Sequence, residues 1–318
     1  MTLFLSSCVS TTQPLIPVTP RIQHVQLDAA GNVTTALQPL RASDVRIEGN
    51  RLFRGEKPLS PAFKAIDSFD VSESRGEVVF SAKRSDHFEI GLVSTDGSPI
   101  SWVPSQNVDQ VGVQWAPLGN KITFIVRAKG GDYLRTLHVP TSAQLLVDFP
   151  GARVGTFGWD PKGERFAVVY STPDASDRVE VMTYSGNERK IAIPPAQQLD
   201  VETASFAPEA VSLRPRDIEY NEKLPLVVWV DDEPFAWSDA RAELMRTSRV
   251  VCIVTRRLDD VVWQAAAGTP WIDRGRTFVV APKGTRVRDA VVITLQSTAP
   301  RFIAERLKRT RPRNGSSR

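Results

Sequence analysis

The triplet Asp231-Asp232-Glu233 is the densest group of potentially chemical side chains, and it directly follows the apolar run Leu224–Val230. Ligands of open α/β sheets bind beyond the carboxyl ends of the strands, and three carboxylates there could hold a divalent cation through their oxygens. Acidic residues are also favoured in the first turn of a helix, where they interact with the unpaired backbone N–H groups and the helix dipole. The helix-start interpretation is the simpler one, so Asp231, Asp232 and Glu233 are only weak metal candidates.

Residues for nucleophilic catalysis are missing from the expected places. No Gly-x-Ser-x-Gly occurs, so no nucleophile elbow can be named. A Ser-His-Asp triad needs a histidine as its base, yet His24, His87 and His138 are the only histidines and all precede residue 139. Their spacing suggests no metal site, and single histidines of this kind are usually plain polar positions. We therefore predict no catalytic residue, no cofactor and no enzymatic activity.

The two cysteines, Cys8 and Cys252, lie in different contexts. Cys252 lies in the apolar run 250–254, where a thiol behaves as a small buried hydrophobic group. Two such cysteines form neither a disulfide framework nor a cysteine-rich zinc site.

The N-terminal sequence Leu5-Ser6-Ser7-Cys8 resembles the lipobox of bacterial lipoproteins. The resemblance implies that Cys8 is the lipidated residue and that residues 1–19 are a signal remnant and a Ser/Thr/Pro-rich tether. Seven residues precede Cys8, which a start codon further upstream would explain. The expected location is the periplasmic side of a membrane; the alternative is a soluble periplasmic or cytoplasmic protein.

A repeat with a period of 44 residues runs through the N-terminal two-thirds of the chain. Segments 115–124 and 159–168 align without gaps, and 71–80 aligns one period earlier. Each unit ends one strand in a bulky apolar residue, which is Trp115 or Trp159 in the two clearest copies. A turn follows, with Pro presetting its second position and Gly suiting its fourth, and then comes an apolar strand.

A unit of about 44 residues with four short strands is the period of a propeller blade. Neighbouring blades bury each other's faces, so we expect Trp115 and Trp159 to pack between blades. The Trp-Pro-Gly pattern resembles the repeats of TolB-like proteins and of the prolyl oligopeptidase propeller. We therefore predict a mainly β fold, with a complete or partial TolB-like β-propeller over residues 20–215 and a faint fourth copy starting at 205–208.

The pattern changes after about residue 216. The run Leu224–Val230 is typical of a strand buried on both faces, and 234–245 has the pattern of an amphipathic helix. Further strands are expected at 250–254, 277–281 and 290–295. These elements predict a small α/β unit over residues 216–298.

This unit resembles the start of the α/β-hydrolase domain of the prolyl oligopeptidase family. Pro208-Glu209 matches the family's lead-in, residues 223–230 match its first buried strand, and Pro234 matches the Pro that follows its His-Gly-Gly turn. This chain has Asp231–Glu233 where the family has His-Gly-Gly. The resemblance implies a truncated, catalytically degenerate domain.

The net charge of +4 is unevenly distributed. Residues 301–318 carry seven basic groups and one acid, which leaves a net charge of about −2 on the rest of the chain. A folded region with this negative net charge is not expected to bind nucleic acid, which needs a basic surface. The basic end, 299–318, is interpreted as a disordered tail, with contact to acidic lipid or to a partner as the alternative.

From these features we expect a non-enzymatic binding or scaffold protein of a bacterial envelope, with protein partners and a membrane anchor at Cys8. Two alternatives remain open. One is a diverged hydrolase that uses other residues or a partner chain. The other is a metal- or small-ligand-binding sensor that uses Asp231–Glu233 or the propeller channel.

Overall fold

The computed structural model describes residues 21–36, 44–105, 107–207, 209–219, 221–281 and 291–294, together with Glu305. Cys8, the tether and the basic tail therefore lie outside the described residues, apart from Glu305. Within the described part of the chain, no helix is both long and apolar enough to cross a membrane.

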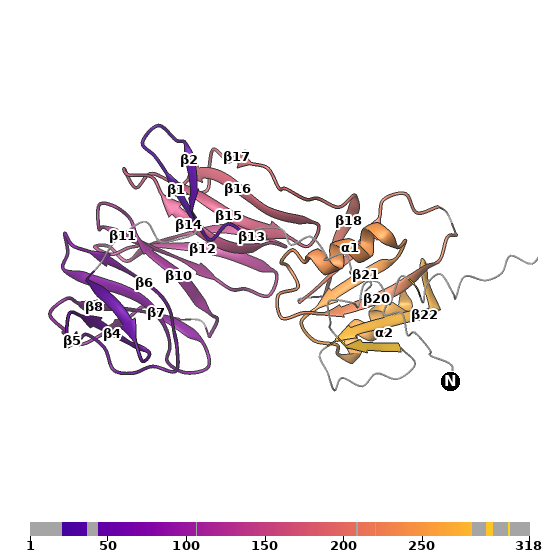
Figure 1. Ribbon diagram of the computed structural model, residues 1–318, viewed down its shortest axis with the longest axis horizontal. Helices are drawn as coiled ribbons and strands as arrows, with labels where there is room; N and C mark the ends of the chain where they lie inside the picture. Colours follow the sequence, from indigo (N-terminus) through magenta and orange to yellow (C-terminus); the bar gives the residue numbers. More distant parts are fainter. Residues whose placement is uncertain are drawn as a thin grey trace, which may run out of the picture.

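Three four-stranded antiparallel sheets follow one another along the chain, as the 44-residue period predicts (Figure 1). Each is a blade whose strands pair in sequence order. The first blade contains β6 (Ile66–Ser72), β7 (Glu77–Lys83), β8 (Phe88–Ser94) and β9 (Ser101–Trp102). The second contains β10 (Gln110–Trp115), β11 (Lys121–Val126), β12 (Gly131–His138) and β13 (Ala143–Pro150). The third contains β14 (Arg153–Trp159), β15 (Arg165–Thr172), β16 (Ala175–Thr183) and β17 (Lys190–Ile193).

Trp115 and Trp159 occupy equivalent positions, which confirms the repeat. Each is the last residue of the first strand of its blade. Trp115 lies in an apolar cluster shared by the first and second blades, and Trp159 in one shared by the second and third. The turns also match, because Gly119 and Gly163 have φ values of +66° and +67°, which glycine adopts without strain.

Two smaller sheets complete the propeller-like region. The hairpin β1 (His24–Leu27) and β2 (Val33–Ala36) packs its Val25 and Leu27 on the third blade. The sheet β3 (Val45–Glu48), β4 (Arg51–Arg54) and β5 (Lys57–Pro58) packs on the first blade through Val45 and Leu52. Strands from the N-terminal part of the chain therefore pack on the two outer blades of the three-blade stack.

Positions 70, 114 and 158 show how successive blades join. The Asp70 carboxylate accepts the Trp115 N–H (2.8 Å), and the Gln114 amide donates to the Phe157 carbonyl (2.6 Å). One period later stands Gly158, and a Cβ there would lie 2.0 Å from the Val25 carbonyl oxygen. The glycine therefore allows the backbone of β1 to lie directly against β14, in the place of a next blade.

The C-terminal unit is a six-stranded mixed sheet in the order β18-β19-β21-β20-β22-β23 with two helices (Figure 1). Its elements are β18 (Val201–Ala207), β19 (Ala210–Pro215), β20 (Leu224–Val230), α1 (Asp239–Thr247), β21 (Val251–Thr255), α2 (Asp260–Gly268), β22 (Ile272–Ala281) and β23 (Val291–Thr294). The strands β21, β20, β22 and β23 are parallel to their neighbours, whereas β19 runs antiparallel to β21.

Both faces of this sheet are buried, as the continuous apolar run of β20 predicts. Val227 and Trp229 lie in the cluster that includes α1, and Leu226 and Val228 lie in the cluster that includes α2. The α/β prediction is confirmed.

Three details differ from the sequence-based expectation. Residues 205–207 of the segment expected to begin a fourth blade end β18, and the β18–β19 hairpin belongs to the C-terminal sheet because β19 pairs with β21. The helix expected at 234–245 begins at Asp239, because Ser238 has an extended backbone and caps it. Helix α2 was not expected, because its apolar residues form no clear helical stripe.

A candidate binding site between the two units

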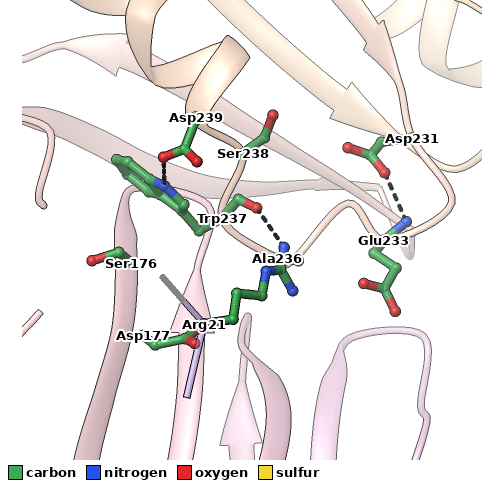
Figure 2. Close-up of a pocket in the computed structure, with 9 residues that line it drawn as sticks. All are labelled: Arg21, Ser176, Asp177, Asp231, Glu233, Ala236, Trp237, Ser238 and Asp239. Carbon is green, nitrogen blue, oxygen red and sulfur yellow. Dashed lines mark hydrogen bonds between the residues drawn. The ribbon is translucent and has the colours of Figure 1, made fainter. Parts of the chain in front are cut away.

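A pocket of about 290 Å³ lies where the third blade meets the α/β unit (Figure 2). Ser176 and Asp177 of β16, together with Arg21 ahead of β1, form its propeller side. The α/β side is formed by the segment after β20 and the start of α1. The residues on that side are Asp231, Glu233, Ala236, Trp237, Ser238 and Asp239.

The segment after β20 is shaped by local hydrogen bonds. The Glu233 N–H donates to the Asp231 carboxylate (3.0 Å), and the Ala236 N–H donates to the Glu233 carbonyl (3.0 Å). Ser238 then caps α1 by accepting the Arg241 N–H (3.4 Å). This tight turn holds Glu233 and Trp237 at the end of the parallel strands, where open α/β sheets place their ligand sites.

Glu233 is bound by an arginine of the third blade. Arg153 Nε and Nη2 both donate to Glu233 Oε1, at 3.1 and 2.8 Å. Partial burial raises the pKa of Glu233, but the charge and hydrogen bonds of Arg153 outweigh it, so the pKa lies below its ordinary value. Glu233 is therefore ionised at neutral pH and paired across the junction.

Arg153 is held from behind by a buried carboxylate of the second blade. Asp132, whose side chain is 1% exposed, accepts from Arg153 Nη1 (3.2 Å), from the Val154 N–H (2.8 Å) and from Arg127 Nη1. Burial raises the pKa of Asp132, and Arg127 and Arg153 counteract it. Arg127, Asp132, Arg153 and Glu233 thus form an ionic chain from the second blade to the α/β unit.

A second arginine lies beneath the pocket. Arg241 of α1 is fully buried, donates to the Ala236 carbonyl and lies 3.6 Å from the Asp231 carboxylate. Within the described structure, its Nε and Nη1 have no hydrogen-bond acceptor. Burial lowers the pKa of Arg241, and it raises the pKa of the nearby Cys252 thiol to about 12. The buried thiol confirms the interpretation of Cys252 as a core residue.

Arg21 joins the N-terminal segment to the α/β unit, as Figure 2 shows. Its Nη2 donates to the Trp237 carbonyl (3.2 Å), and the neighbouring Ile22 N–H donates to Asp177 (3.0 Å). Burial raises the pKa of Asp177, whereas the Ile22 amide and Arg21 lower it. Burial outweighs these two effects, so the pKa of Asp177 lies above its ordinary value.

The serines around the pocket are occupied as structural hydrogen-bond acceptors. Ser238 caps α1, Ser176 Oγ accepts the Gln197 N–H (2.9 Å), and Ser171 Oγ accepts the Trp237 N–H (3.3 Å). The residues that line the pocket include no histidine, lysine or cysteine. The lining is therefore polar, with four carboxylates and serine oxygens that accept from backbone N–H groups.

The acidic triplet does not converge on one point. Glu233 is paired with Arg153 and Asp231 lies beside Arg241, while Asp232 is exposed and its carbonyl accepts from Arg256 (3.1 Å). No three His, Cys, Asp or Glu side chains that could hold a metal occur together in the described ranges. The geometry thus assigns Asp231 and Glu233 to ion pairs, and the helix expected directly after the triplet starts only at Asp239.

None of the three histidines lines the pocket. His24 is on β1, His87 lies between β7 and β8, and His138 ends β12. Sequence reasoning found two residues of the pocket, Asp231 and Glu233. It missed Arg153 and Arg241, which pair with these two carboxylates from outside the pocket lining. A single arginine forms no sequence motif, and its partner is known only once distant elements have come together.

No protein-family profile and no curated relative matches the sequence. The fold is similar to solved structures of acylaminoacyl peptidase. One, in complex with Z-Gly-Gly-Phe-chloromethyl ketone, has a TM-score of 0.54 at 11% identity and covers 72% of this chain and 43% of its own. The uncomplexed Pyrococcus horikoshii enzyme gives the same values, and its orthorhombic crystal form gives a TM-score of 0.53 at 12% identity.

The chain thus spans less than half the length of these peptidases. At such low identity the likeness concerns the fold alone. Together with the blades described above, it defines the class of this protein as mainly β, with propeller-type sheets followed by an α/β unit.

Proposed function

We propose that this chain is a non-catalytic binding or scaffold protein of a bacterial envelope, anchored through Cys8, with the propeller-like surface and the junction pocket as its contact sites. The proposal is supported by one observation: the pocket between the two units has the position of a ligand site, and the serines that line it in the described structure accept hydrogen bonds from backbone N–H groups. Protein partners are expected, whereas nucleic acid is not.

A diverged hydrolase is the second candidate, and the fold favours it. The peptidases to which the fold is similar are hydrolases, and the sheet order, with its antiparallel second strand, is that of the first strands of an α/β-hydrolase. In that fold the nucleophile follows the fifth strand. The corresponding strand here is β22, and the residues after it, Pro282-Lys283-Gly284-Thr285, include no serine.

Fluorophosphonate probes separate the two candidates. We expect purified protein to remain unlabelled and to cleave no peptide or ester substrate, because no histidine lines the pocket to activate a serine. Intact-mass measurement after probe treatment checks this, with an active serine hydrolase as the positive control. Stoichiometric labelling of a serine within 205–300, lost in the corresponding alanine variant, would establish the hydrolase instead.

Lipidation of Cys8 tests the proposed location. Expressed in a bacterium with its upstream coding sequence, the protein should incorporate a palmitate analogue and partition into detergent. Cys8→Ser should abolish both, since each buried CH₂ of an acyl chain contributes about 0.8 kcal/mol to membrane binding. Cys252→Ser is the matched control and should keep the label, because Cys252 is fully buried.

Two results would contradict the anchor. A wild-type protein that stays soluble and unlabelled would remove the envelope assignment. Membrane association that survives Cys8→Ser but is lost at high salt would assign the attachment to the basic segment 299–318.

A further inference from the structure

The outer strand of the second blade, β13, is the longest outer strand of the three blades. All eight of its residues, Ala143–Pro150, pair with β12, and the register has no shift. The outer strands of the other two blades, β9 and β17, have only two and four residues. In the described structure β13 is the last strand of its sheet, so its second edge pairs with no strand. This edge presents a long row of backbone groups to which another strand can bind.

The edge of β13 lacks most of the features that keep such edges from pairing. Proteins protect exposed edges by short strands, lysines, prolines, bulges or a covering segment. In β13 no residue is basic, Asp148 is the only charge, and the only proline is the last residue. Two adjacent leucines are exposed instead, Leu145 by 41% and Leu146 by 58%. The strand therefore combines an open backbone edge with apolar side chains on both of its faces.

The backbone groups of β13 that point outward can be identified from one hydrogen bond. Arg189 of the third blade donates to the Asp148 carbonyl (3.0 Å), which therefore points away from β12. The N–H and C=O groups of every second residue in an antiparallel strand point to the same side. Those of Leu146 and Gln144 thus point outward as well, and the Asp148 carbonyl keeps a second lone pair for a further donor.

The sequence of β13 is complementary to itself. When two copies run antiparallel and cross at Leu146, this residue faces its counterpart, Gln144 faces Asp148, and Leu145 faces Val147. The only charge of the strand then meets an amide that can donate to it, and the apolar side chains meet apolar side chains. No like charges oppose each other. A second copy of this chain therefore supplies a matching residue at every position through symmetry alone.

We propose that the chain forms a twofold dimer in which the outer edges of two β13 strands pair antiparallel about Leu146. The pairing joins two four-stranded blades into one eight-stranded sheet. Each copy uses the same surface, so the assembly closes after two copies. No residue of β13 lines the junction pocket, so the dimer and ligand binding there are separate properties. The dimer is compatible with a scaffold and with a hydrolase, and it does not rest on the proposed function.

Cysteine cross-linking of the full chain tests the contact. In a Cys8→Ser background, Leu146→Cys should give a covalent dimer on mild oxidation. The Cα atoms of a hydrogen-bonded antiparallel pair lie about 5.5 Å apart, which a disulfide can span. Cys252 is fully buried and should not react. Ile191→Cys is the matched control, since Ile191 is a similarly exposed apolar residue of β17, at 52%, and should stay monomeric on a non-reducing gel.

Two further variants test the register. Gln144→Cys and Asp148→Cys should each fail to cross-link alone, because the two copies of either position lie about 14 Å apart, four residues along the strand. Mixed with each other, they should form the disulfide-linked dimer, since Gln144 faces Asp148 of the other copy. Self-cross-linking of Gln144→Cys as fast as that of Leu146→Cys would overturn the proposed pairing.

Sedimentation equilibrium measures the affinity of the dimer. The Cys8→Ser protein should be a dimer that dissociates on dilution. Adding Leu146→Lys should raise its dissociation constant by at least about tenfold, because two lysines then face each other across the twofold axis. The circular dichroism spectrum should not change, since the side chain is largely exposed. Ile191→Lys should leave the dissociation constant unchanged. A monomer at every concentration, or a dimer that is insensitive to Leu146→Lys, would overturn the proposal.

Discussion

Replacing Trp115 with alanine is expected to lower the free energy of unfolding by about 3–5 kcal/mol, the range for removing a fully buried large side chain. Trp115 is 2% exposed and fills the space between the first and second blades beside Val113 and Phe124. Its loss leaves a cavity at a blade interface, where packing from both sides is lost together. Urea unfolding followed by circular dichroism measures the change.

Two further variants make this test specific to the repeat. Trp159→Ala should cost a similar amount, because Trp159 has the same place one blade later and is 7% exposed. Leu118→Ala, three residues from Trp115 but 65% exposed, should change stability by less than about 0.5 kcal/mol. Equal effects of Trp115→Ala and Leu118→Ala would contradict the blade packing described above.

Gly158→Ala is expected to cost about 3 kcal/mol, or to detach the N-terminal hairpin from the third blade. The added Cβ would lie 2.0 Å from the Val25 carbonyl oxygen and 2.9 Å from its carbon. These are backbone atoms of a paired strand, so no side chain can rotate away, and the cost falls at the upper end of that for overpacking. Thermal unfolding and limited proteolysis within residues 21–36 report the two outcomes.

Gly155→Ala is the matched control in the same strand. The nearest atom to a Cβ at Gly155 is the Val169 carbonyl oxygen, at 3.8 Å, an ordinary contact. That variant should unfold and digest like the wild type. If Gly158→Ala did the same, the close approach of β1 to β14 would be wrong.

The arrangement of blades was predictable because its signals are local and repeated. Trp, Pro and Gly recur at fixed offsets, and each specifies a strand end or a turn through its own shape and its own φ preference. The buried strand Leu224–Val230 was equally clear, because a strand covered on both faces needs a continuous apolar run. These features depend on neighbours in the sequence, so the sequence determined them by itself.

The partnership of distant strands was decided only by tertiary structure. The segment 201–215 has strand character in either unit, and only its pairing with β21 assigns it to the α/β sheet. Likewise, a glycine is needed at position 158 only because the backbone of β1, more than 130 positions earlier in the chain, lies against it. Propensity and periodicity carry no information about such partners.

For the candidate site too, one part was predictable from the sequence and another was decided by tertiary structure. The sequence placed Asp231 and Glu233 at the end of a buried strand, because the run before them and the acids themselves are contiguous. It could not show that Glu233 is neutralised by Arg153 or that Asp231 lies beside the buried Arg241. An isolated arginine is compatible with any surface, and its charge acquires a role only when folding brings a particular carboxylate beside it.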